Sequence, residues 1–183
     1  MKYVGIDLAG NPKNDTGFCI LEITGKGRAI SASVLHSDSE IMGRIDKNSP
    51  DLIAIDAPLT YAGINRKCDE DLRSYGALPA TLPGMEVLAK RGTNLAKELG
   101  RKGLRSIEVY ATASAKILGF YDKDERITQK KLMDSDLEGD IQKRILSKDE
   151  LDSVFCAFTA YLHASGQTEQ VGDDTGKITI PKV

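Results

Sequence analysis

The sequence predicts an α/β protein built on a mixed five-stranded sheet, in which three antiparallel strands are followed by parallel strands, with helices on the flanks. Two observations predict this fold class. Residues 2–35 hold three successive runs of apolar, β-branched and aromatic residues separated by turn-forming segments, which is typical of an antiparallel meander. A helical pattern follows, and then comes the continuous apolar run 52–56, which is typical of a strand buried on both faces of a parallel sheet.

The first third of the chain is expected to supply four strands and one helix. Strands are predicted over residues 2–8, where two sets of side chains alternate, and over 16–23 and 28–35, with a turn at 24–27 between the last two. A helix from about residue 37 to 48 begins with a Ser-Asp pair suited to N-capping and carries isoleucines four residues apart.

A helical, locally basic insertion is predicted around 60–104. The segment 57–83 is rich in proline and glycine and holds one short helix near 66–74. Apolar residues then recur at helical spacing between 85 and 99, and Gly100 to Gly103 stop that helix with basic residues at its negative end.

The C-terminal part is expected to alternate strand and helix. It predicts a short strand at 107–110, a helix at 112–118, a charged linker at 121–131 and a polar amphipathic helix at about 135–146. The tail from 176 onward is a candidate edge strand.

A last helix is predicted to begin at Lys148. Ser147 and Glu150 have the spacing of a capping box, in which each side chain bonds the other's backbone N–H. The body of this helix is apolar on nearly every side, so we expect it to be buried against the sheet.

Length and charge limit the domain count and the kind of partner. A chain of 183 residues is about one domain at roughly 150 residues per domain, so we expect one domain over 1–183. The formal net charge of −2 excludes a basic field over the whole molecule, of the kind that binds nucleic acid indiscriminately. A polyanion must therefore be met by a local site.

The cysteines and the N-terminus point to the cytoplasm. Three widely spaced cysteines without a CxxC motif argue against a disulfide framework and against structural zinc. Asp7 interrupts the N-terminal apolar run before a signal-peptide core can form, and no apolar run reaches about 18 residues. We expect a cytoplasmic protein without a membrane partner; a homodimer is compatible with the sequence.

Carboxylates inside apolar elements are the strongest functional signal, because an isolated buried charge is costly unless it is paired or bound to metal. Asp7 and Asp56 end two predicted strands, and Asp152 lies on the same helix face as two core residues. Glu108, inside the short strand, is a fourth candidate.

A divalent cation is the expected partner of these carboxylates. If the strands of Asp7 and Asp56 are parallel neighbours, the two side chains emerge at the same carboxyl edge and repel each other. Two Mg²⁺ or Mn²⁺ ions that share one aspartate would remove this repulsion and could activate water for phosphodiester cleavage. The two histidines lie in unrelated elements, so oxygen ligands and a hard cation are favoured over zinc.

Structural roles remain open for most of these residues. Asp7 and Asp56 could each close a loop or a turn. Asp149 and Glu150 lie in the first turn of the last helix, where acidic residues interact favourably with the helix dipole. The glycines at 5–17 suggest a phosphate cradle but match neither the Walker pattern nor the dinucleotide fingerprint, and a tight hairpin that needs a positive φ at Gly10 explains them at least as well.

The basic residues of the insertion are candidates for contact with substrate phosphates. Nine basic and five acidic residues lie between 66 and 105, in a molecule that is acidic overall. Arg66, Lys90 and Arg91 are the candidates that we single out, and a solvated helix face is the equally supported alternative.

A family resemblance joins these observations. The segments VGIDLAG, DLIAIDAPL, RKCDEDLRSYG, IEVY with TASAKIL, and DELDSVFCAFTAYLHASG together resemble a family of predicted RNase H-like nucleases, over roughly residues 2–166 and the ITIP tail. The resemblance implies an RNase H-like fold, with Asp7, Asp56 and Asp152 as metal ligands and Glu108 as a further member of the acidic cluster.

The function expected from the sequence is that of a divalent-metal-dependent nuclease, in which Asp7 bridges two ions and Asp56 and Asp152 complete their ligand sets. The alternative is a non-catalytic module that keeps the fold and binds nucleic acid or another partner. A nucleotide-binding ATPase with a similar first hairpin is disfavoured, because such enzymes close two domains over the nucleotide and this chain has the length of one.

Overall fold

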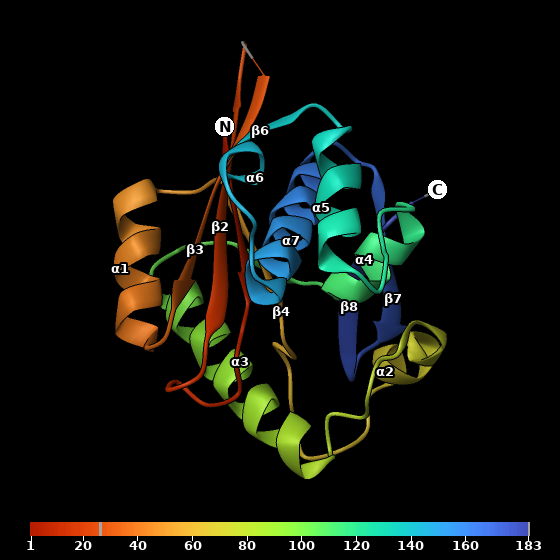
Figure 1. Ribbon diagram of the computed structural model, residues 1–183. Coiled ribbons are helices and arrows are strands. Elements are labelled where there is room, and N and C mark those ends of the chain that lie inside the picture. The colour runs from red at the N-terminus through yellow and green to blue at the C-terminus, as the bar shows by residue number, and fades with distance from the viewer. Residues whose placement is uncertain (26, 183) are drawn as a thin grey trace.

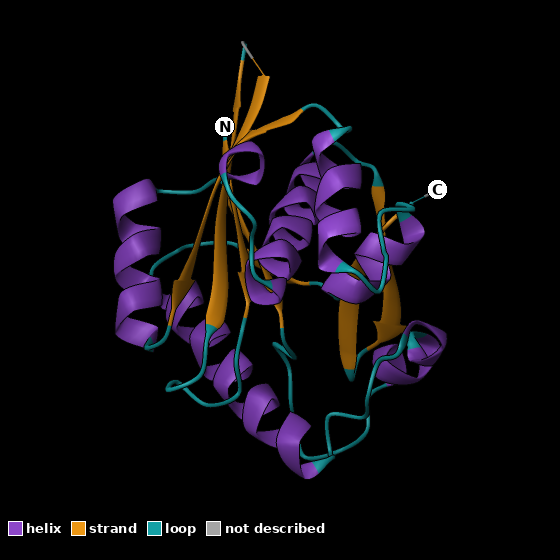
Figure 2. Cartoon of the chain, viewed as in Figure 1, coloured by secondary structure: helices purple, strands orange, loops and turns teal. Residues whose placement is uncertain are grey.

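A mixed sheet runs through the middle of the protein. The computed structural model describes residues 1–25 and 27–182, and the main sheet of this part has the strand order β5-β4-β1-β2-β3-β6 (Figures 1 and 2). Its strands are β1 (Lys2–Asp7), β2 (Thr16–Thr24), β3 (Gly27–Leu35), β4 (Leu52–Asp56), β5 (Ser106–Glu108) and β6 (Leu137–Gly139). A separate hairpin consists of β7 (Thr168–Asp173) and β8 (Gly176–Pro181).

The strand directions are those that the sequence predicts. β1, β2 and β3 form the antiparallel meander, and β4 and β5 add to β1 in parallel. The sheet has one strand more than predicted, because β6 pairs in parallel with the outer edge of β3. The fold is therefore mixed α/β with a six-stranded sheet flanked by helices.

Helices cover both faces of the sheet (Figure 1). Buried side chains of α1 and α3 meet Val4, Ile6 and Ile53 on one face, and α7 packs with Tyr3 and Leu21 on the other. The helices are α1 (Asp38–Asn48), α2 (Lys67–Asp71), α3 (Pro83–Arg101), α4 (Ala111–Ile117), α5 (Glu125–Met133), α6 (Asp140–Lys143) and α7 (Lys148–Ala164), with a 3₁₀ turn η1 (Arg73–Tyr75).

Helix α7 begins where its capping box predicts. The Ser147 hydroxyl accepts the Glu150 backbone N–H at 3.2 Å, and the Glu150 carboxylate accepts the Ser147 N–H at 2.9 Å. Arg144 reinforces this start because its guanidinium donates to both Glu150 oxygens, at 2.6 and 2.9 Å. The first turn of α7 is thus fixed in position, and with it the side chains that it presents.

Two predictions for residues 121–146 are wrong. The expected linker contains helix α5, which Asp124 caps by accepting the Arg126 N–H at 2.9 Å. The expected helix over 135–146 is replaced by β6 and the single turn α6. The reason is local, since Asp136 and Gly139 have φ values of 59° and 98°, outside the right-handed helical region.

The C-terminal tail forms a strand, as expected, within the separate hairpin. β8 pairs along its length with β7, and one isolated parallel bridge between Val109 and Thr179 connects it to the segment after β5. Lys26 in the predicted turn at 24–27 and Val183 at the end of the tail lie outside the described residues.

Helix α7 contacts the sheet at the level of the backbone. A Cβ on Gly5 would overlap the carbonyl oxygen of Ser153, and a Cβ on Gly17 would overlap that of Asp149. Glycine at these two strand positions therefore sets how close α7, and the carboxylates in its first turns, can come to the strand ends.

We expect Gly5→Ala to lower the free energy of unfolding by about 3 kcal/mol, because the added methyl group overpacks a close contact that neither backbone can relax cheaply. Gly43→Ala in α1 is the matched control, since a Cβ there meets nothing within 4 Å, and it should stabilise the protein by roughly 0.5–1 kcal/mol. Urea unfolding of both variants measures the difference. Equal stabilities would contradict direct packing of α7 on β1.

Candidate active site

Two carboxylates stand side by side at one edge of the sheet. Asp7 and Asp56 are the last residues of β1 and β4, and they are register partners in this parallel pair. The Asp56 carboxylate accepts the backbone N–H of Ala111 at 3.0 Å, which ties it to the start of α4. Both residues are only partly exposed, so the edge holds two carboxylates with little access to water.

Helix α7 brings Asp152 to the same place. Its side chain is 15% exposed and pairs with the Lys148 ammonium one turn earlier. The charge of Asp152 raises the pKa values of both Asp7 and Asp56, which locates the three carboxylates within electrostatic reach of one another. We therefore refer to Asp7, Asp56 and Asp152 as the carboxylate triad.

Burial and mutual repulsion raise the pKa values of the triad. Burial raises the pKa of Asp56 to about 7, with a further contribution from Asp152, and the Ala111 N–H opposes the shift. The pKa of Asp7 lies well above its usual value because of burial first, and then because of Asp56 and Asp152. Burial also raises the pKa of Asp152, and Lys148 opposes this. The charged forms are thus penalised when no further cation is present.

Asp149 also belongs to this edge, although sequence reasoning gave it only a helix-dipole role. It lines an open pocket of about 570 Å³ together with Asp7 and the loop that follows β1. Its charge raises the pKa values of Asp7 and Asp152. The sequence does contain a signal for this role of Asp149, because it precedes Asp152 by three residues and the two therefore lie on one face of the helix.

The loop after β1 is held by a buried arginine. The Arg91 guanidinium donates to the carbonyl oxygens of Ala9 at 2.6 Å and His36 at 2.7 Å, and to the Asp38 carboxylate at 2.9 Å. Gly10 is not among the described residues with positive φ, so the positive φ expected there is wrong, although the loop does join β1 to the antiparallel strand β2. Arg91 holds the start of this loop through the Ala9 carbonyl.

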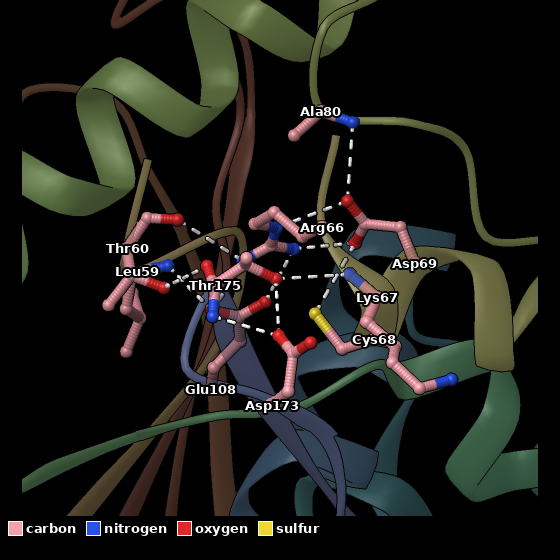
Figure 3. A network of polar contacts seen from close by, with 10 residues as sticks. All are labelled: Leu59, Thr60, Arg66, Lys67, Cys68, Asp69, Ala80, Glu108, Asp173 and Thr175. Carbon is pink, nitrogen blue, oxygen red and sulfur yellow. Dashed lines mark hydrogen bonds and ion pairs between the residues drawn. The ribbon is translucent and has the colours of Figure 1, made fainter. Parts of the chain in front are cut away.

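Glu108 lies in a separate buried network (Figure 3). It ends β5, is 6% exposed, and accepts the Leu59 backbone N–H at 2.7 Å. Arg66 engages both of its oxygens, at 2.8 and 3.0 Å, and also binds Asp69 in a bidentate pair at 2.6 and 3.1 Å. Glu108 raises the pKa of Asp56, so it neighbours the triad, but Arg66 uses its oxygens.

The three basic candidates are dispersed. Arg66 and Arg91 are 2% and 8% exposed, and their guanidinium groups bind carboxylates and carbonyl oxygens inside the protein. The Lys90 side chain is 64% exposed and pairs with Glu86 one turn earlier. The structure brings none of the three together at the triad, and only Lys90 presents its charge to solvent.

The balance of charge decides where a cation fits. In the described residues, the group whose potential ligand atoms all lie within 4.8 Å is Cys68, Asp69 and Glu108, and Arg66 already neutralises it. The triad oxygens are farther apart than that. However, the triad and Asp149 bring four carboxylates close together, and Lys148 is the cation whose charge lowers the pKa values of all three triad members. The donor set and the uncompensated charge at the strand ends fit a hard divalent cation.

Comparisons with known proteins support the fold. No family model and no curated protein matches the chain. Among solved structures, Thermus thermophilus RuvC in complex with a Holliday junction substrate is similar at a TM-score of 0.57 and 10% sequence identity, covering 91% of this chain and 97% of that chain. A second Thermus thermophilus RuvC structure gives a TM-score of 0.55 and 12% identity, over the same shares of both chains.

None of the helices in the described part of the chain has the length and apolar character that a membrane span requires.

The similarity over nine-tenths of the chain extends to the mixed sheet and the helices that cover it. The protein therefore has the RNase H-like fold of RuvC, and its carboxylate triad lies at the carboxyl edge of that sheet.

Proposed function

We propose that this protein is a divalent-metal-dependent nuclease that hydrolyses phosphodiester bonds in nucleic acid. The observation that carries the proposal is the cluster of carboxylates at the strand ends, where Asp7, Asp56, Asp152 and Asp149 lie within electrostatic reach of one another and Lys148 pairs with Asp152. The RuvC-like fold supports it, since one similar structure holds a nucleic acid substrate.

Each acidic residue has a distinct role in this proposal. Asp7, Asp56 and Asp152 would hold Mg²⁺ or Mn²⁺, and we assign the role of shared ligand to Asp7, because Asp56 lies beside it and Asp149 lines the same pocket. When bound, the cations would lower the pKa of a water molecule and neutralise charge on the phosphate. Glu108 is a positioning residue, because Arg66 and the Leu59 N–H occupy its oxygens.

Lys148 and the Ala111 N–H limit how the triad moves. The Ala111 N–H fixes Asp56 from the α4 side. The Lys148 ammonium holds Asp152 on α7, and it must give up this pair for Asp152 to become a metal ligand. Lys148 then remains close to the site as a cation that can meet a substrate phosphate there, as does Lys13 in the pocket of Asp7 and Asp149.

The test is a cleavage assay on a labelled panel of duplex DNA, RNA–DNA hybrid, single-stranded and four-way-junction substrates, with Mn²⁺ or Mg²⁺ and with EDTA. We expect cleavage of at least one substrate that depends on the metal and stops with EDTA. Absence of cleavage on every substrate with both metals would refute the proposal.

A non-catalytic nucleic-acid-binding module is the second candidate, and the Lys148–Asp152 ion pair favours it, because the protein then supplies its own cation to the acidic edge. Calorimetric titration with Mn²⁺ separates the two. Binding that Asp7→Asn removes supports the nuclease, whereas no metal binding together with salt-sensitive binding of nucleic acid supports the module.

Asp56→Asn should stabilise the metal-free protein at pH 8, on the order of 2 kcal/mol, and raise its melting temperature by roughly 4–8 °C. The folded protein holds the Asp56 proton up to about pH 7, whereas the unfolded chain releases it near pH 4. Stability from this group therefore falls as pH rises through that window. Asparagine keeps an oxygen for the Ala111 N–H and carries no charge.

Thermal melts at pH 5 and pH 8 measure this effect. The increase in melting temperature caused by Asp56→Asn should be smaller at pH 5 than at pH 8. Saturating Mn²⁺ should raise the melting temperature of the parent protein but not that of Asp56→Asn. Asp46→Asn, at an exposed side chain paired with Lys102, is the control and should change little. A gain that is equal at both pH values would contradict the raised pKa.

A further inference from the structure

A cavity of about 130 Å³ opens beside the triad. Asp56 is among its lining residues, so the cavity adjoins the site already described. Met85 and Leu88 of α3 also line it, and so does Leu78, which is 54% exposed. The cavity is much smaller than the roughly 300–1,000 Å³ of pockets for drug-sized ligands, so it suits a single small ring system.

The walls are largely apolar, and the Asp56 carboxylate, which binds the Ala111 N–H through one oxygen, is the acceptor beside them. Pro58, Leu78, Met85 and the ring of Tyr110 contribute apolar surface. Arg66 also lines the cavity, but its N–H groups are engaged by Asp69, Glu108 and the Thr60 carbonyl.

The lining excludes several ligand classes. A phosphate or carboxylate would meet the carboxylates of Asp56, Asp69 and Glu108, while the N–H groups of Arg66 are already engaged. A purely aliphatic group would bury the Asp56 carboxylate further and offer it no hydrogen bond in addition to the one from the Ala111 N–H. A flat ring with apolar faces and N–H donors on its edge suits both the walls and the Asp56 carboxylate.

A nucleic acid at the triad carries such a ring next to every phosphate. Enzymes that take a base out of the stack hold it between aromatic and apolar side chains and read its edge by hydrogen bonds. Carboxylates accept hydrogen bonds from exocyclic amino groups of bases, as Glu and Asp do from cytosine. Adenine, cytosine and guanine carry that group, and thymine and uracil do not.

We propose that this cavity binds an unstacked nucleobase with an exocyclic amino group, from a nucleotide adjoining the cleaved phosphate. The inference rests on the proposed nuclease function and adds a base preference to it. The phosphate lies at the triad, the base enters past Leu78, and its amino group donates to the Asp56 carboxylate, because Arg66 and the Leu59 N–H engage the oxygens of Glu108.

Methionine methyl groups provide a readout that does not depend on cleavage. The chain has four methionines, and Met85 lines the cavity whereas Met133 lies in α5, 40% exposed. Protein with ¹³C-labelled methionine methyls is titrated, with Ca²⁺ in place of Mg²⁺, with the trinucleotides d(TXT) in which X is adenine, cytosine, guanine, thymine or an abasic residue.

A ring stacked in the cavity should shift the Met85 methyl signal upfield when X is adenine, cytosine or guanine, and leave Met133 unchanged. No Met85 shift up to millimolar trinucleotide overturns the proposal. An equal shift with the abasic or the thymine trinucleotide also overturns it.

Filling the cavity should remove the base preference. Met85→Trp occupies the space, and Val87→Trp, on the same helix and 52% exposed outside the lining, is the matched control. We expect Met85→Trp to cut Mn²⁺-dependent cleavage of the intact substrate about ten-fold or more. On a substrate with an abasic residue beside the cleaved phosphate, Met85→Trp should cleave at the rate of the parent protein. Val87→Trp should cleave both substrates at the rate of the parent.

The two proposals fail in different ways. Mn²⁺-dependent cleavage that is indifferent to the abasic residue and to Met85→Trp overturns the base pocket and leaves the nuclease standing. A Met85 shift specific for amino-bearing bases, without cleavage of any substrate, overturns the nuclease and leaves base binding standing.

Discussion

Asp7→Asn is expected to reduce metal-dependent cleavage by at least about a thousand-fold while the protein stays folded. Asp7 is the residue on which the neighbouring carboxylates converge, since its pKa is raised by Asp56, Asp152 and Asp149 after burial. Loss of a ligand shared between cations removes several kcal/mol of stabilisation of the transition state, and each 1.36 kcal/mol is a factor of ten in rate. Single-turnover cleavage with Mn²⁺ measures the loss.

The same substitution should not weaken the fold. Asparagine removes one of the like charges that crowd the edge, so the metal-free melting temperature should equal or exceed that of the parent at pH 8. Asp46→Asn, far from the triad and exposed, should leave both cleavage and melting unchanged. Cleavage by Asp7→Asn at the parent rate would remove Asp7 from the mechanism, whatever the melting curves show.

The strand ends of the candidate site could be predicted because they depend on local patterns. The apolar run of β4 and the alternation in β1 each end at an aspartate, and the parallel register then places Asp7 beside Asp56. The capping box likewise fixes the start of α7 from a four-residue pattern. These signals act over a few residues, so they appear in a single sequence.

The ion-pair networks could not be predicted, because their members are distant in sequence. Arg66 binds Glu108 across 42 residues, and Arg91 binds Asp38 across 53. In the sequence, both arginines resemble exposed cations of a basic segment. Only the fold shows that the two arginines bind carboxylates and carbonyl oxygens inside the protein. The fold likewise shows that Lys148 of α7, and not Arg66 or Arg91, faces the triad.

Arg66→Met should be the most destabilising substitution of a charged residue considered in this protein, with a loss of about 3–5 kcal/mol in the free energy of unfolding. The arginine is 2% exposed and neutralises Asp69 and Glu108, which are each 6% exposed. Without it, two carboxylates remain buried with no counter-charge. Arg126→Met, on the exposed N-terminal turn of α5, is the matched control and should cost little.

The dependence on pH and a compensating variant identify the cause. Burial already raises the pKa of Glu108 in the presence of Arg66, and removing the guanidinium raises it further. The deficit of Arg66→Met should therefore grow as pH rises from 5 to 8, because the folded protein then holds protons that the unfolded chain has released. A triple variant that adds Asp69→Asn and Glu108→Gln to Arg66→Met should recover part of the stability. This triple variant also provides a folded sample if Arg66→Met alone does not fold.

These measurements also separate a structural role of Arg66 from the phosphate contact that its sequence position suggests. If Arg66 bound a substrate phosphate, its substitution would leave the melting temperature nearly unchanged. The salt dependence of nucleic acid binding would then fall by the contribution of about one phosphate contact. The buried network predicts the opposite pattern, a large loss of stability together with an unchanged salt dependence in the triple variant. Equal melting temperatures for Arg66→Met and Arg126→Met would show that the guanidinium does not neutralise this network.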